Sequence, residues 1–452
     1  MTKITDKTKV HIRENLGFYI FIAISALLMF LSIVWVYHVK VLNAPKVYSD
    51  GFGYYLYLPA IIHGDFSFGF IEGWEHPFDL IAVDGGIIDK YPVGVAILES
   101  PFFFFAHVVC LVKDALTGSM TATGYSNLYQ YMVLFGGVLY WVVGTVLLYE
   151  LLVKYLGFSK KVSLAACAVI TYGTNLSYDA CFSHVYSYFL FNLFLFYLCW
   201  YEAREQERKN RLIHTCIFGL IAGLIFMCRN TNILFVLTYV FYGVRNWETF
   251  QKRMVTILKP ARSVPIVLTG AVSLLPQLLY WHAATGHWFV YSYGSNEPFY
   301  WLAPQIGNFL FSVRKGMFFW SPLLLLAIVG IFMSYKKRKQ LYVGLVVFLV
   351  LIIYVSSAWW SWYYGGSFGQ RVVVDFLCVF AIFLAYVFAH VEQHKKEKGG
   401  KERLLAGFVY GYCGVCVLWN LWCMAAYWYR VLPSDKADWN TIRDIVGMIF
   451  NL

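Results

Sequence analysis

The sequence has little charge. Asp, Glu, Lys and Arg make up 13% of its 452 residues, whereas 60% of the residues are hydrophobic. A soluble domain carries about 25% charged residues and an apolar share nearer half, so this composition excludes an ordinary soluble protein. The sequence also has no Walker loop and no H-E-x-x-H motif, which excludes P-loop ATPases and zincins.

Disulfide and zinc patterns are missing as well. Most of the ten cysteines fall inside apolar segments, where cysteine behaves as a small hydrophobic residue. Cys413 and Cys416 form a C-x-x-C pair, but no second pair and no nearby histidine accompany them. We therefore expect no disulfide framework in the loops and no structural zinc site.

Long apolar runs dominate what is present. The ranges 17–38, 264–282, 341–359 and 404–427 carry no charge. Each has roughly the 20 residues that a helix needs to cross about 30 Å of hydrocarbon. Because every backbone polar group in lipid must be paired within its segment, these runs predict spanning helices. The first run follows four basic residues and is too long for a cleaved signal, so we expect it to remain as the first span.

The basic residues predict how the chain is threaded. Most of the 36 Lys and Arg residues lie in six segments, which are 1–16, 154–161, 202–212, 245–262, 336–339 and 392–403. A surplus of Lys and Arg marks cytoplasmic loops, so the net charge of +11 reflects membrane orientation and not nucleic-acid binding. Placing these segments inside requires the apolar range 92–113 to stay at the outer surface as an interfacial or re-entrant helix.

The predicted fold is an all-α integral membrane protein with about eleven spans in one domain, residues 1–452. The ranges 162–201 and 213–244 should form helical hairpins. Three outer loops are large enough to build a site: 39–125, which carries interfacial helices, 284–316 and 359–370. The C-terminal tail, 428–452, should also lie outside. Any chemistry is therefore expected on the side opposite the cytoplasm.

Asp50 is the most informative residue of the first loop. It follows the first span by about a dozen residues, and two glycines and an aromatic run come after it. A carboxylate pressed against a membrane is costly to keep without a function, and it can accept a proton or hold a cation. Aspartate is equally a preferred N-cap, here for a helix over 54–62. The residues alone do not decide between these two interpretations.

Few basic residues face outward. Lys90, Arg314, Lys315 and Arg371 fall in outer loops or at the mouths of spans, and Arg229 falls at the tip of a predicted hairpin. Ammonium and guanidinium groups gathered at a membrane surface bind phosphate, and arginine offers a two-pronged contact. Contact with ordinary anionic headgroups is the alternative.

Aromatic and histidine residues also gather at the outer ends of the spans. Trp362 and Tyr363 belong to an aromatic cluster that fits either an interfacial belt or a groove for a sugar or lipid. His184, His282 and His287 could be combined with Asp50 or Glu297 into a metal site, but their spacing matches no known ligand motif.

Six stretches together resemble the GT-C glycosyltransferases, which are multi-spanning membrane enzymes. They read SDGFGYYLYLPA from Ser49, DKYPVGVAILESPFF from Asp89, CFSHVYSYFLFNL around His184, FMCRNTN around Arg229, RKGMFFWSPLLLLAIVGI from Arg314, and FGQRVVVDFL around Arg371. The chain is similar to the bacterial branch that uses polyprenyl-phosphate sugars, a branch related to the protein mannosyltransferases and to the lipid A aminoarabinose transferase. The resemblance extends from the first helix to about residue 390 and rests on the order and spacing of the stretches.

The resemblance implies sugar transfer from a polyprenyl-phosphate carrier to a lipid, glycan or protein acceptor, with inversion at the anomeric carbon. It implies a bacterial inner membrane protein whose site faces the periplasm or exterior. Asp50 matches the acidic residue that acts at the reacting centre in this family, and we expect it to be the general base. Many relatives carry two adjacent acids at that point, whereas here Ser49 precedes Asp50, which weakens metal dependence; a divalent metal stays open and no other cofactor is implied.

The other expected site residues follow from this scheme. Lys90, Arg314, Lys315 and Arg371 should stabilise the phosphate of the donor. Weaker candidates for substrate contacts are Tyr54, Tyr55, His184, Glu297, Trp362 and Tyr363.

Three other functions stay open. A transporter or flippase of lipid-linked glycan would need ionisable residues near the middle of the membrane, and apart from Asp375 and Glu99 the spans have few of them. A scaffold without catalytic activity would tolerate loss of the Asp50 carboxylate. An enzyme of the same architecture could also use a different donor, such as a diphosphate-linked oligosaccharide.

Overall fold

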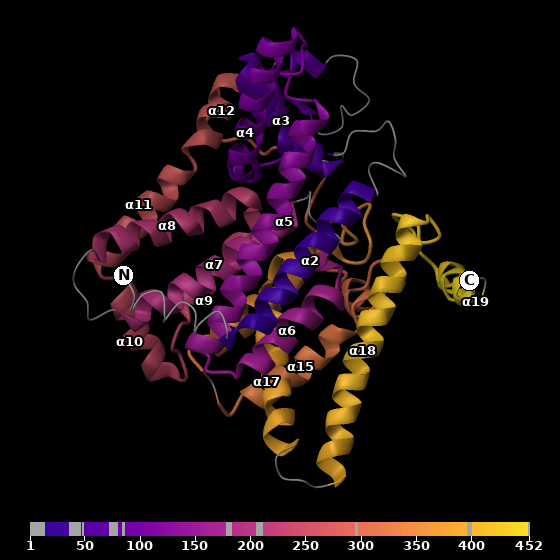
Figure 1. The fold of residues 1–452 in the computed structure, drawn as a ribbon. Helices are drawn as coiled ribbons and strands as arrows, with labels where there is room; N and C mark the ends of the chain where they lie inside the picture. The colour runs from indigo at the N-terminus through magenta and orange to yellow at the C-terminus, as the bar shows by residue number, and fades with distance from the viewer. Residues whose placement is uncertain are drawn as a thin grey trace, which may run out of the picture.

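The computed structural model describes residues 14–35, 47, 49–71, 80–83, 86–177, 183–204, 211–293, 297–337, 339–395 and 400–450. Within these residues the chain is mostly helical, in agreement with the predicted fold class. Parts of the predicted N-terminal segment, of the first outer loop and of the hairpin turn at 178–182 lie outside the described residues. Figure 1 shows an elongated bundle in which α3 lies at one end, and the C-terminal end of α17 and the start of α18 lie at the other.

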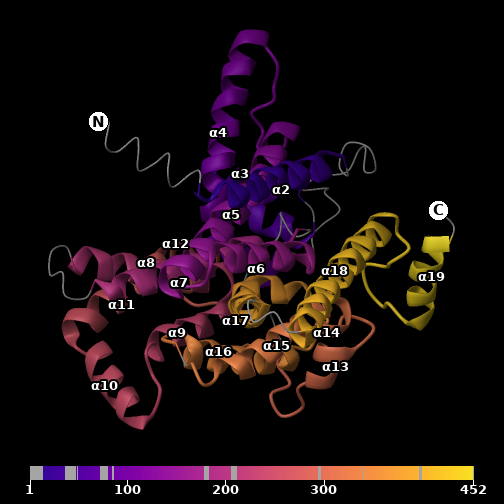
Figure 2. The same ribbon diagram turned by 60° about the horizontal axis from the view of Figure 1, so that its bottom comes forward.

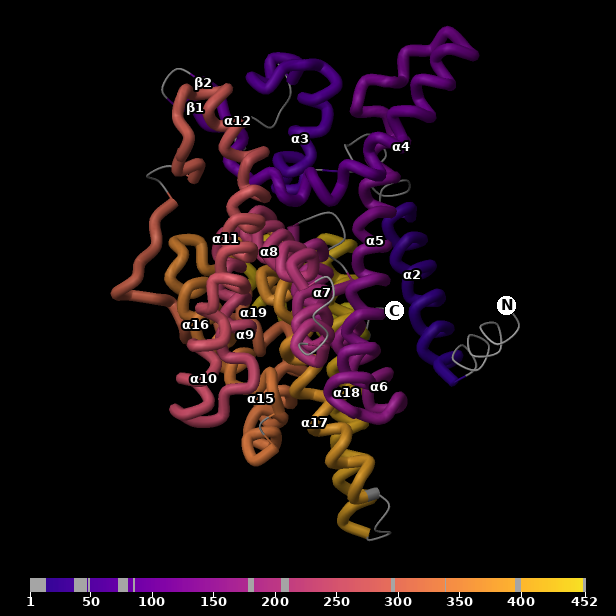
Figure 3. The backbone as a smooth tube through the Cα atoms, turned by 90° about the vertical axis from the view of Figure 1, so that its left-hand side faces the viewer, coloured from indigo at the N-terminus to yellow at the C-terminus, as the bar shows by residue number. Residues whose placement is uncertain are grey.

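The part of the first outer loop that the structure describes forms a compact cap. It comprises α3 (Asp50–His63), a short 3₁₀ turn η2 (Gly69–Ile71), the antiparallel strands β1 (Leu80–Val83) and β2 (Gly86–Asp89), and α4 (Gly94–Thr117). In the hairpin, Leu80 pairs with Asp89 and Val83 pairs with Gly86. Figure 3 shows α3, α4 and the hairpin together at one end of the bundle. The sequence predicted helices in this loop but no strands.

Six described helices are long and apolar enough to cross a membrane, or seven if one bent pair forms a single span. The six are α2 (Leu16–Trp35), α4 (Gly94–Thr117), α5 with the π-helical turn η4 (Asn127–Tyr155), α8 (Arg211–Cys228), η7 with most of α17 (Arg371–His394) and α18 (Gly400–Trp428). In the third of these, α5 is Asn127–Glu150 and η4 is Leu151–Tyr155. In the fifth, η7 is Arg371–Phe376 and α17 is Leu377–Lys395. The chain is therefore a multi-pass membrane protein, although the count of about eleven spans is not confirmed.

The lower count has a physical reason, because several apolar segments are short or broken. These are α6 (Lys160–Tyr172, followed by the turn η5, Asn175–Ser177), η6 with α9 (Asn230–Val236 and Leu237–Val240), α10 to α12 (Trp247–Ile257, Pro260–Ser273 and Leu275–Thr285), α13 and α14 (Ile306–Phe311 and Met317–Trp320), α15 (Leu323–Ser334) and α16 (Tyr342–Ala358). Helix α7 (Ser183–Ala203) has 21 residues but is not among the six. Helices α10 and α11 meet at an angle of 69°. Short helices suffice where neighbouring protein pairs the backbone.

Helix α4 covers the range that was expected to stay at the membrane surface. Its length and composition also suit a span. Figure 2 shows α4 projecting away from the main bundle, and Figure 3 shows it at the end that holds the cap. Its placement at the outer surface remains a prediction.

Two large groups of buried side chains, and a small third group near the C-terminus, form the core of the described residues. The larger one surrounds α17, whose spanning window is 94% buried, and α17 packs against α6, α15 and α18. The smaller one joins α3, α4 and the start of α5 with Tyr280 of α12. Leu56, Phe103 and Tyr129 are fully buried in this smaller group. The cap therefore has a hydrophobic core of its own.

Candidate active site

A cavity of about 550 Å³ lies between the cap and the bundle. Its lining comes from seven parts of the chain: the start of α3, the end of the hairpin, the start of α7, residues 229–231, the segments 291–299 and 359–371, and the C-terminal tail. The lining residues are Asp50, Tyr54, Lys90, Tyr91, Ser183, His184, Arg229, Asn230, Thr231, Tyr291, Tyr293, Glu297, Phe299, Trp359, Trp360, Ser361, Tyr363, Tyr364, Gly365, Arg371 and Asp435. Its size suits a small-molecule site.

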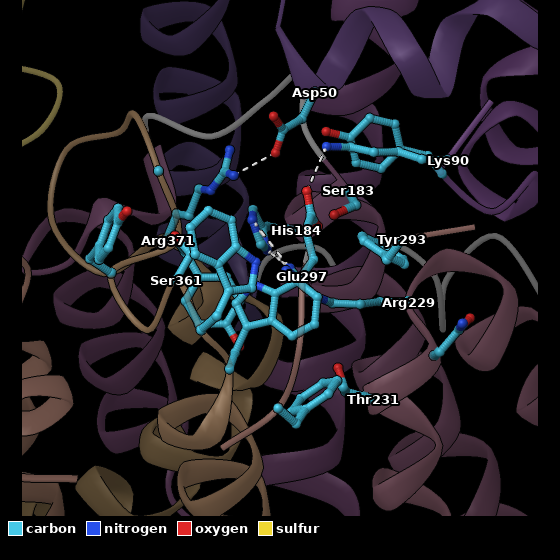
Figure 4. A pocket seen from close by; sticks show the side chains of 18 of the residues that line it. Asp50, Lys90, Ser183, His184, Arg229, Thr231, Tyr293, Glu297, Ser361 and Arg371 are labelled. Carbon is cyan, nitrogen blue, oxygen red and sulfur yellow. Dashed lines mark hydrogen bonds and ion pairs between the residues drawn. The ribbon is translucent and has the colours of Figure 1, made fainter. Parts of the chain in front are cut away.

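Asp50 is the first residue of α3, and Ser49 occupies the cap position without a capping side-chain bond. Ser49 has a φ of 54°, which is uncommon for a residue with a side chain and is found where the surroundings impose it. The carboxylate of Asp50 forms a salt bridge with Nη2 of Arg371 (Figure 4). Asp50 therefore faces the cavity and pairs with a cation, and it does not serve as the N-cap.

The electrostatic surroundings keep Asp50 ionised. Burial is the largest single influence and by itself raises the pKa of Asp50. Arg371, then Lys90, and a hydrogen bond from Tyr91 together outweigh it, so that its pKa lies below its ordinary value. Asp50 is therefore a carboxylate at neutral pH.

The loop before Arg371 depends on unusual backbone conformations. Tyr364, Gly365 and Gly369 all have positive φ, at 53°, 66° and 63°. Glycine adopts this region without strain, which explains the glycines in this stretch. The side chain of Gln370 donates to the carbonyl of Trp362 at 3.0 Å and ties the two ends of the loop together. This folding places Arg371 at the cavity.

A second ion pair lines the cavity. Nζ of Lys90 lies 3.6 Å from Oε1 of Glu297. Lys90 also lies over the ring of Tyr91, 5.1 Å from its centroid. The pair joins the end of the hairpin in the first loop to the outer loop 284–316, as expected if both loops contribute to one site.

A buried cluster forms the floor of the cavity. Asp375 is fully buried and accepts a hydrogen bond from Nδ1 of His184 at 2.7 Å and from Nδ2 of Asn232 at 3.0 Å. Nη1 of Arg229 lies 3.9 Å from the same carboxylate and 3.1 Å from the ring of His184. Arg229 also lies over the ring of Tyr364. One acid in a span thus orients a histidine and an arginine that face the cavity (Figure 4).

Aromatic side chains make the wall opposite Asp50. Phe299 and Trp359 form an isolated antiparallel bridge, and their rings are 4.6 Å apart. Tyr293 contacts Trp359 edge to face at 5.6 Å. Flat apolar surfaces together with a few converging polar groups are typical of small-molecule pockets. This composition suits a ring that has one apolar face and many hydroxyl groups.

The structure brings most of the sequence-predicted residues together. Seven of them line the cavity: Asp50, Tyr54, Lys90, His184, Glu297, Tyr363 and Arg371. Tyr55 does not, because its ring packs on Phe103 and its hydroxyl donates to the carbonyl of Gly124. Trp362 is also absent from the lining and lies beside Arg314.

Arg314 and Lys315 are likewise outside the lining, although they were expected to bind phosphate. Nε and Nη2 of Arg314 each donate at 2.8 Å to the carboxylate of Asp435. Lys315 is 2% exposed and donates to the carbonyl of Ser434 at 2.8 Å and to that of Ser367. Both cations are engaged with protein groups behind the cavity wall.

Several residues of the cavity lining and of the buried cluster beneath it were not assigned to the site from the sequence. Arg229 was singled out only as an outward-facing cation, and Asp375 only as a rare acid in a span. That rarity was the available signal, since an ionisable residue in a span usually has a function. Tyr293 and Asp435 carried no signal, because nothing in their local sequence shows that they meet the cavity.

No three His, Cys, Asp or Glu side chains of the described part of the chain converge closely enough to hold a metal ion. His282 stacks on Trp288, and neither His282 nor His287 lines the cavity. The structure thus does not assemble the metal site that combined these histidines with Asp50 or Glu297.

The Asp375 cluster leads to a stability prediction. Asp375→Ala removes the carboxylate that pairs with His184 and lies 3.9 Å from Arg229, and it leaves Asn232 with the hydroxyl of Ser187 as its remaining acceptor. Breaking such a buried pair should cost about 3–5 kcal/mol of unfolding free energy. Thermal unfolding of the purified protein in detergent measures this loss. Glu248→Ala removes a carboxylate that is 69% exposed and serves as the control; equal midpoints for the two variants would refute the prediction.

Comparisons with known proteins give a likeness of fold only. No protein-family model matches the sequence, and no curated protein matches it. Among solved structures the chain is similar to the oligosaccharyltransferase of Archaeoglobus fulgidus in complex with zinc and sulfate. The TM-score is 0.48 and the identity 12%, over 91% of this chain and 53% of the other.

A second structure of an Archaeoglobus fulgidus enzyme, the oligosaccharyltransferase AglB with an inhibitory peptide and a dolichol-phosphate, gives a TM-score of 0.47. The identity is again 12%, over 90% of this chain and 55% of the other. The chain thus spans about half the length of each structure that it resembles.

Proposed function

We propose that this chain is a membrane-embedded glycosyltransferase that moves a sugar from a polyprenyl-phosphate carrier to an acceptor. We place it in the bacterial inner membrane, with its cavity facing the periplasm or exterior. The observation that carries the proposal is the Asp50 carboxylate, which forms a salt bridge with Arg371 in a cavity that is lined by aromatic side chains and by Lys90. The sequence resemblance to GT-C enzymes supports the same reaction.

Three cations line the cavity and are available to the donor phosphate: Lys90, Arg229 and Arg371. Arginine binds phosphate oxygens through two parallel hydrogen bonds, and lysine adds a point charge. Arg371 forms a salt bridge with Asp50. A phosphate that takes Arg371 therefore competes directly with Asp50.

This competition links donor binding to the chemistry. While Asp50 is paired with Arg371 its pKa is low, and it is a weak base. When the phosphate engages Arg371, Asp50 loses its main counter-charge and its pKa rises. The freed carboxylate then accepts the proton of the acceptor hydroxyl or amine, or orients that group for attack.

The reaction is a displacement with inversion at the anomeric carbon. The acceptor atom forms a bond to this carbon and gives its proton to Asp50. The bond between the anomeric carbon and the phosphate oxygen breaks, and its electron pair leaves with the polyprenyl phosphate. The cations stabilise this leaving group, an effect that is usually large in a pocket that excludes water. Tyr54, His184, Glu297 and Tyr363 are placed to contact the sugar or the acceptor.

The direct test uses proteoliposomes that contain the purified protein and a panel of polyprenyl-phosphate sugars with radiolabel in the sugar. Transfer of label to an added lipid, glycan or peptide acceptor supports the proposal. If label instead crosses the bilayer on its original lipid without transfer, the protein is a flippase. A diphosphate-linked sugar included in the panel identifies the kind of donor.

The pH dependence provides a specific check. The profile of kcat/KM follows the free enzyme and that of kcat follows the donor complex. Because the pKa of Asp50 is low only while Arg371 is its partner, the acidic fall of kcat should lie at higher pH than that of kcat/KM. Transfer rates from about pH 4 to 8 at saturating and at low donor measure both profiles. If kcat and kcat/KM fall at the same acidic pH, the donor phosphate does not compete with Asp50 for Arg371.

A further inference from the structure

Part of the C-terminal tail contributes to the lining of the cavity. Helix α18 ends at Trp428, and α19 (Trp439–Phe450) lies beside it (Figure 1). We call residues 429–438, which connect the two helices, the strap. Asp435 of the strap is part of the cavity lining, although it lies 385 positions after Asp50 in the sequence. The proposed mechanism does not use this segment.

The first attachment of the strap is ionic. Both carboxylate oxygens of Asp435 accept from Arg314, at 2.8 Å each, in the two-pronged geometry that gives arginine pairs their directionality. The guanidinium of Arg314 in turn lies 3.4 Å from the ring centroid of Tyr363. Tyr363 lines the cavity, so Asp435 and Arg314 support its ring from behind.

The second attachment is a set of backbone bonds. The carbonyl of Ser434 accepts from Nζ of Lys315 at 2.8 Å and from the backbone N–H of Ser367 at 3.0 Å. Lys315 also donates to the carbonyl of Ser367. Burial, followed by the charge of Arg371, lowers the pKa of Lys315 to about 7. An amine in this position is held by fixed carbonyl partners and links the strap to the loop that carries Arg371.

The course of the strap is determined by its surroundings. Arg430 and Lys436, near its two ends, have positive φ values of 61° and 59°. Such conformations are costly for residues with side chains and persist only when surrounding contacts impose them. Leu432 packs in a small buried cluster with Trp320 and Phe368. The indole of Trp422 donates to the carbonyl of Ile445 at 2.9 Å and holds α19 against α18.

We infer that the strap is a positioning element of the cavity, in which Asp435 acts through Arg314 on Tyr363, and Ser434 acts through Lys315 and Ser367 on the loop that ends at Arg371. Asp435 is thus a positioning residue. The inference rests on the proposed function only where it concerns sugar transfer. If the strap loses its contact with Arg314, the loop that ends at Arg371 is held less firmly. The affinity for the donor then falls more than the rate of the chemical step.

The experiment compares wild type, Asp435→Ala, Arg314→Asp and the charge-swapped double variant Arg314→Asp with Asp435→Arg. Asp435→Ala should raise the KM for donor about tenfold with a smaller change in kcat, as expected for a lost charged hydrogen bond. The double variant should recover part of the loss, because the swapped pair can form again. Asp444→Ala on exposed α19 is the matched control and should behave as wild type.

A second readout does not depend on activity. Trypsin cleavage after Arg430 should be faster in Asp435→Ala than in wild type and should slow again in the double variant, because cleavage reports the released strap. Mass spectrometry identifies this cut, since Asp435→Arg adds a cleavage site of its own beside Lys436. If cleavage and donor KM both match wild type, the inference is wrong. If wild type transfers no sugar, the proposed function fails while the cleavage rates still decide whether Arg314 holds the strap. Asp435→Asn replaces Asp435→Ala if the latter does not fold.

Discussion

Asp50→Asn is expected to lower the rate of sugar transfer by about 10²- to 10⁴-fold, which is the usual contribution of a positioned acid or base. The substitution keeps the shape of the side chain and removes its charge and its ability to accept a proton. Arg371 then has no carboxylate competing for it, so donor binding should be unchanged or tighter. The expected pattern is a large loss of kcat without a rise in donor KM.

The control for this prediction lies in the same loop. Asp65 is an exposed carboxylate near the end of α3 that bonds with Ser67 and lies outside the cavity. Asp65→Asn should transfer sugar at the rate of wild type. Initial rates with radiolabelled donor in proteoliposomes measure both variants. An Asp50→Asn protein that is folded and as fast as wild type would exclude Asp50 as the base and favour a scaffold.

Arg371→Ala should produce the second largest loss, and the kinetic pattern should differ. Truncating one partner of a buried charge pair costs about 2–5 kcal/mol, or about 30- to 5,000-fold. We expect this loss mainly as a raised donor KM. Arg371→Lys keeps the charge and loses the two-pronged contact, so it should be intermediate.

The same variant also acts on Asp50. Without Arg371 the pKa of Asp50 should rise, because burial is then opposed by Lys90 and Tyr91 alone. The acidic fall of kcat/KM should therefore move to higher pH in Arg371→Ala. Arg443→Ala, which removes a side chain that is 77% exposed on α19, is the control. An unchanged donor KM in Arg371→Ala would remove Arg371 from the phosphate site.

The membrane class and an apolar first helix could be predicted from the sequence alone. Asp50, Lys90, Glu297 and Arg371 could be singled out because charged residues near membrane spans are rare, so that their presence is itself a signal. The structure places all four in the lining of one cavity, and their roles stay predictions. It could not predict the salt bridge between Asp50 and Arg371. That contact depends on how two distant loops fold, and neither loop has a local pattern that fixes its path.

Other differences have separate causes. Hydropathy averages apolar residues over a window, and it does not show that the helices α15 and α16 have only 12 and 17 residues. The two-residue connection of the hairpin at Asp84 and Gly85 lies outside the described residues, although D-G is a known turn signal. In the sequence, Arg314 and Lys315 resemble phosphate ligands. Their partners, Asp435 and Ser434, lie in the C-terminal tail, and the sequence does not show this contact.

The two hydrophobic cores described above divide the cavity between them. Asp50 begins a helix whose side chains pack mainly in the cap, whereas Arg371 precedes residues packed deep in the bundle around α17. Their salt bridge therefore joins the two groups, as do α3, α4 and α5, each of which has buried residues in both. If a donor phosphate takes Arg371 as proposed, the polar link at Asp50 is broken while these helices still join the cap to the bundle. Ligand exchange then changes side-chain partners inside the cavity and leaves both hydrophobic cores packed.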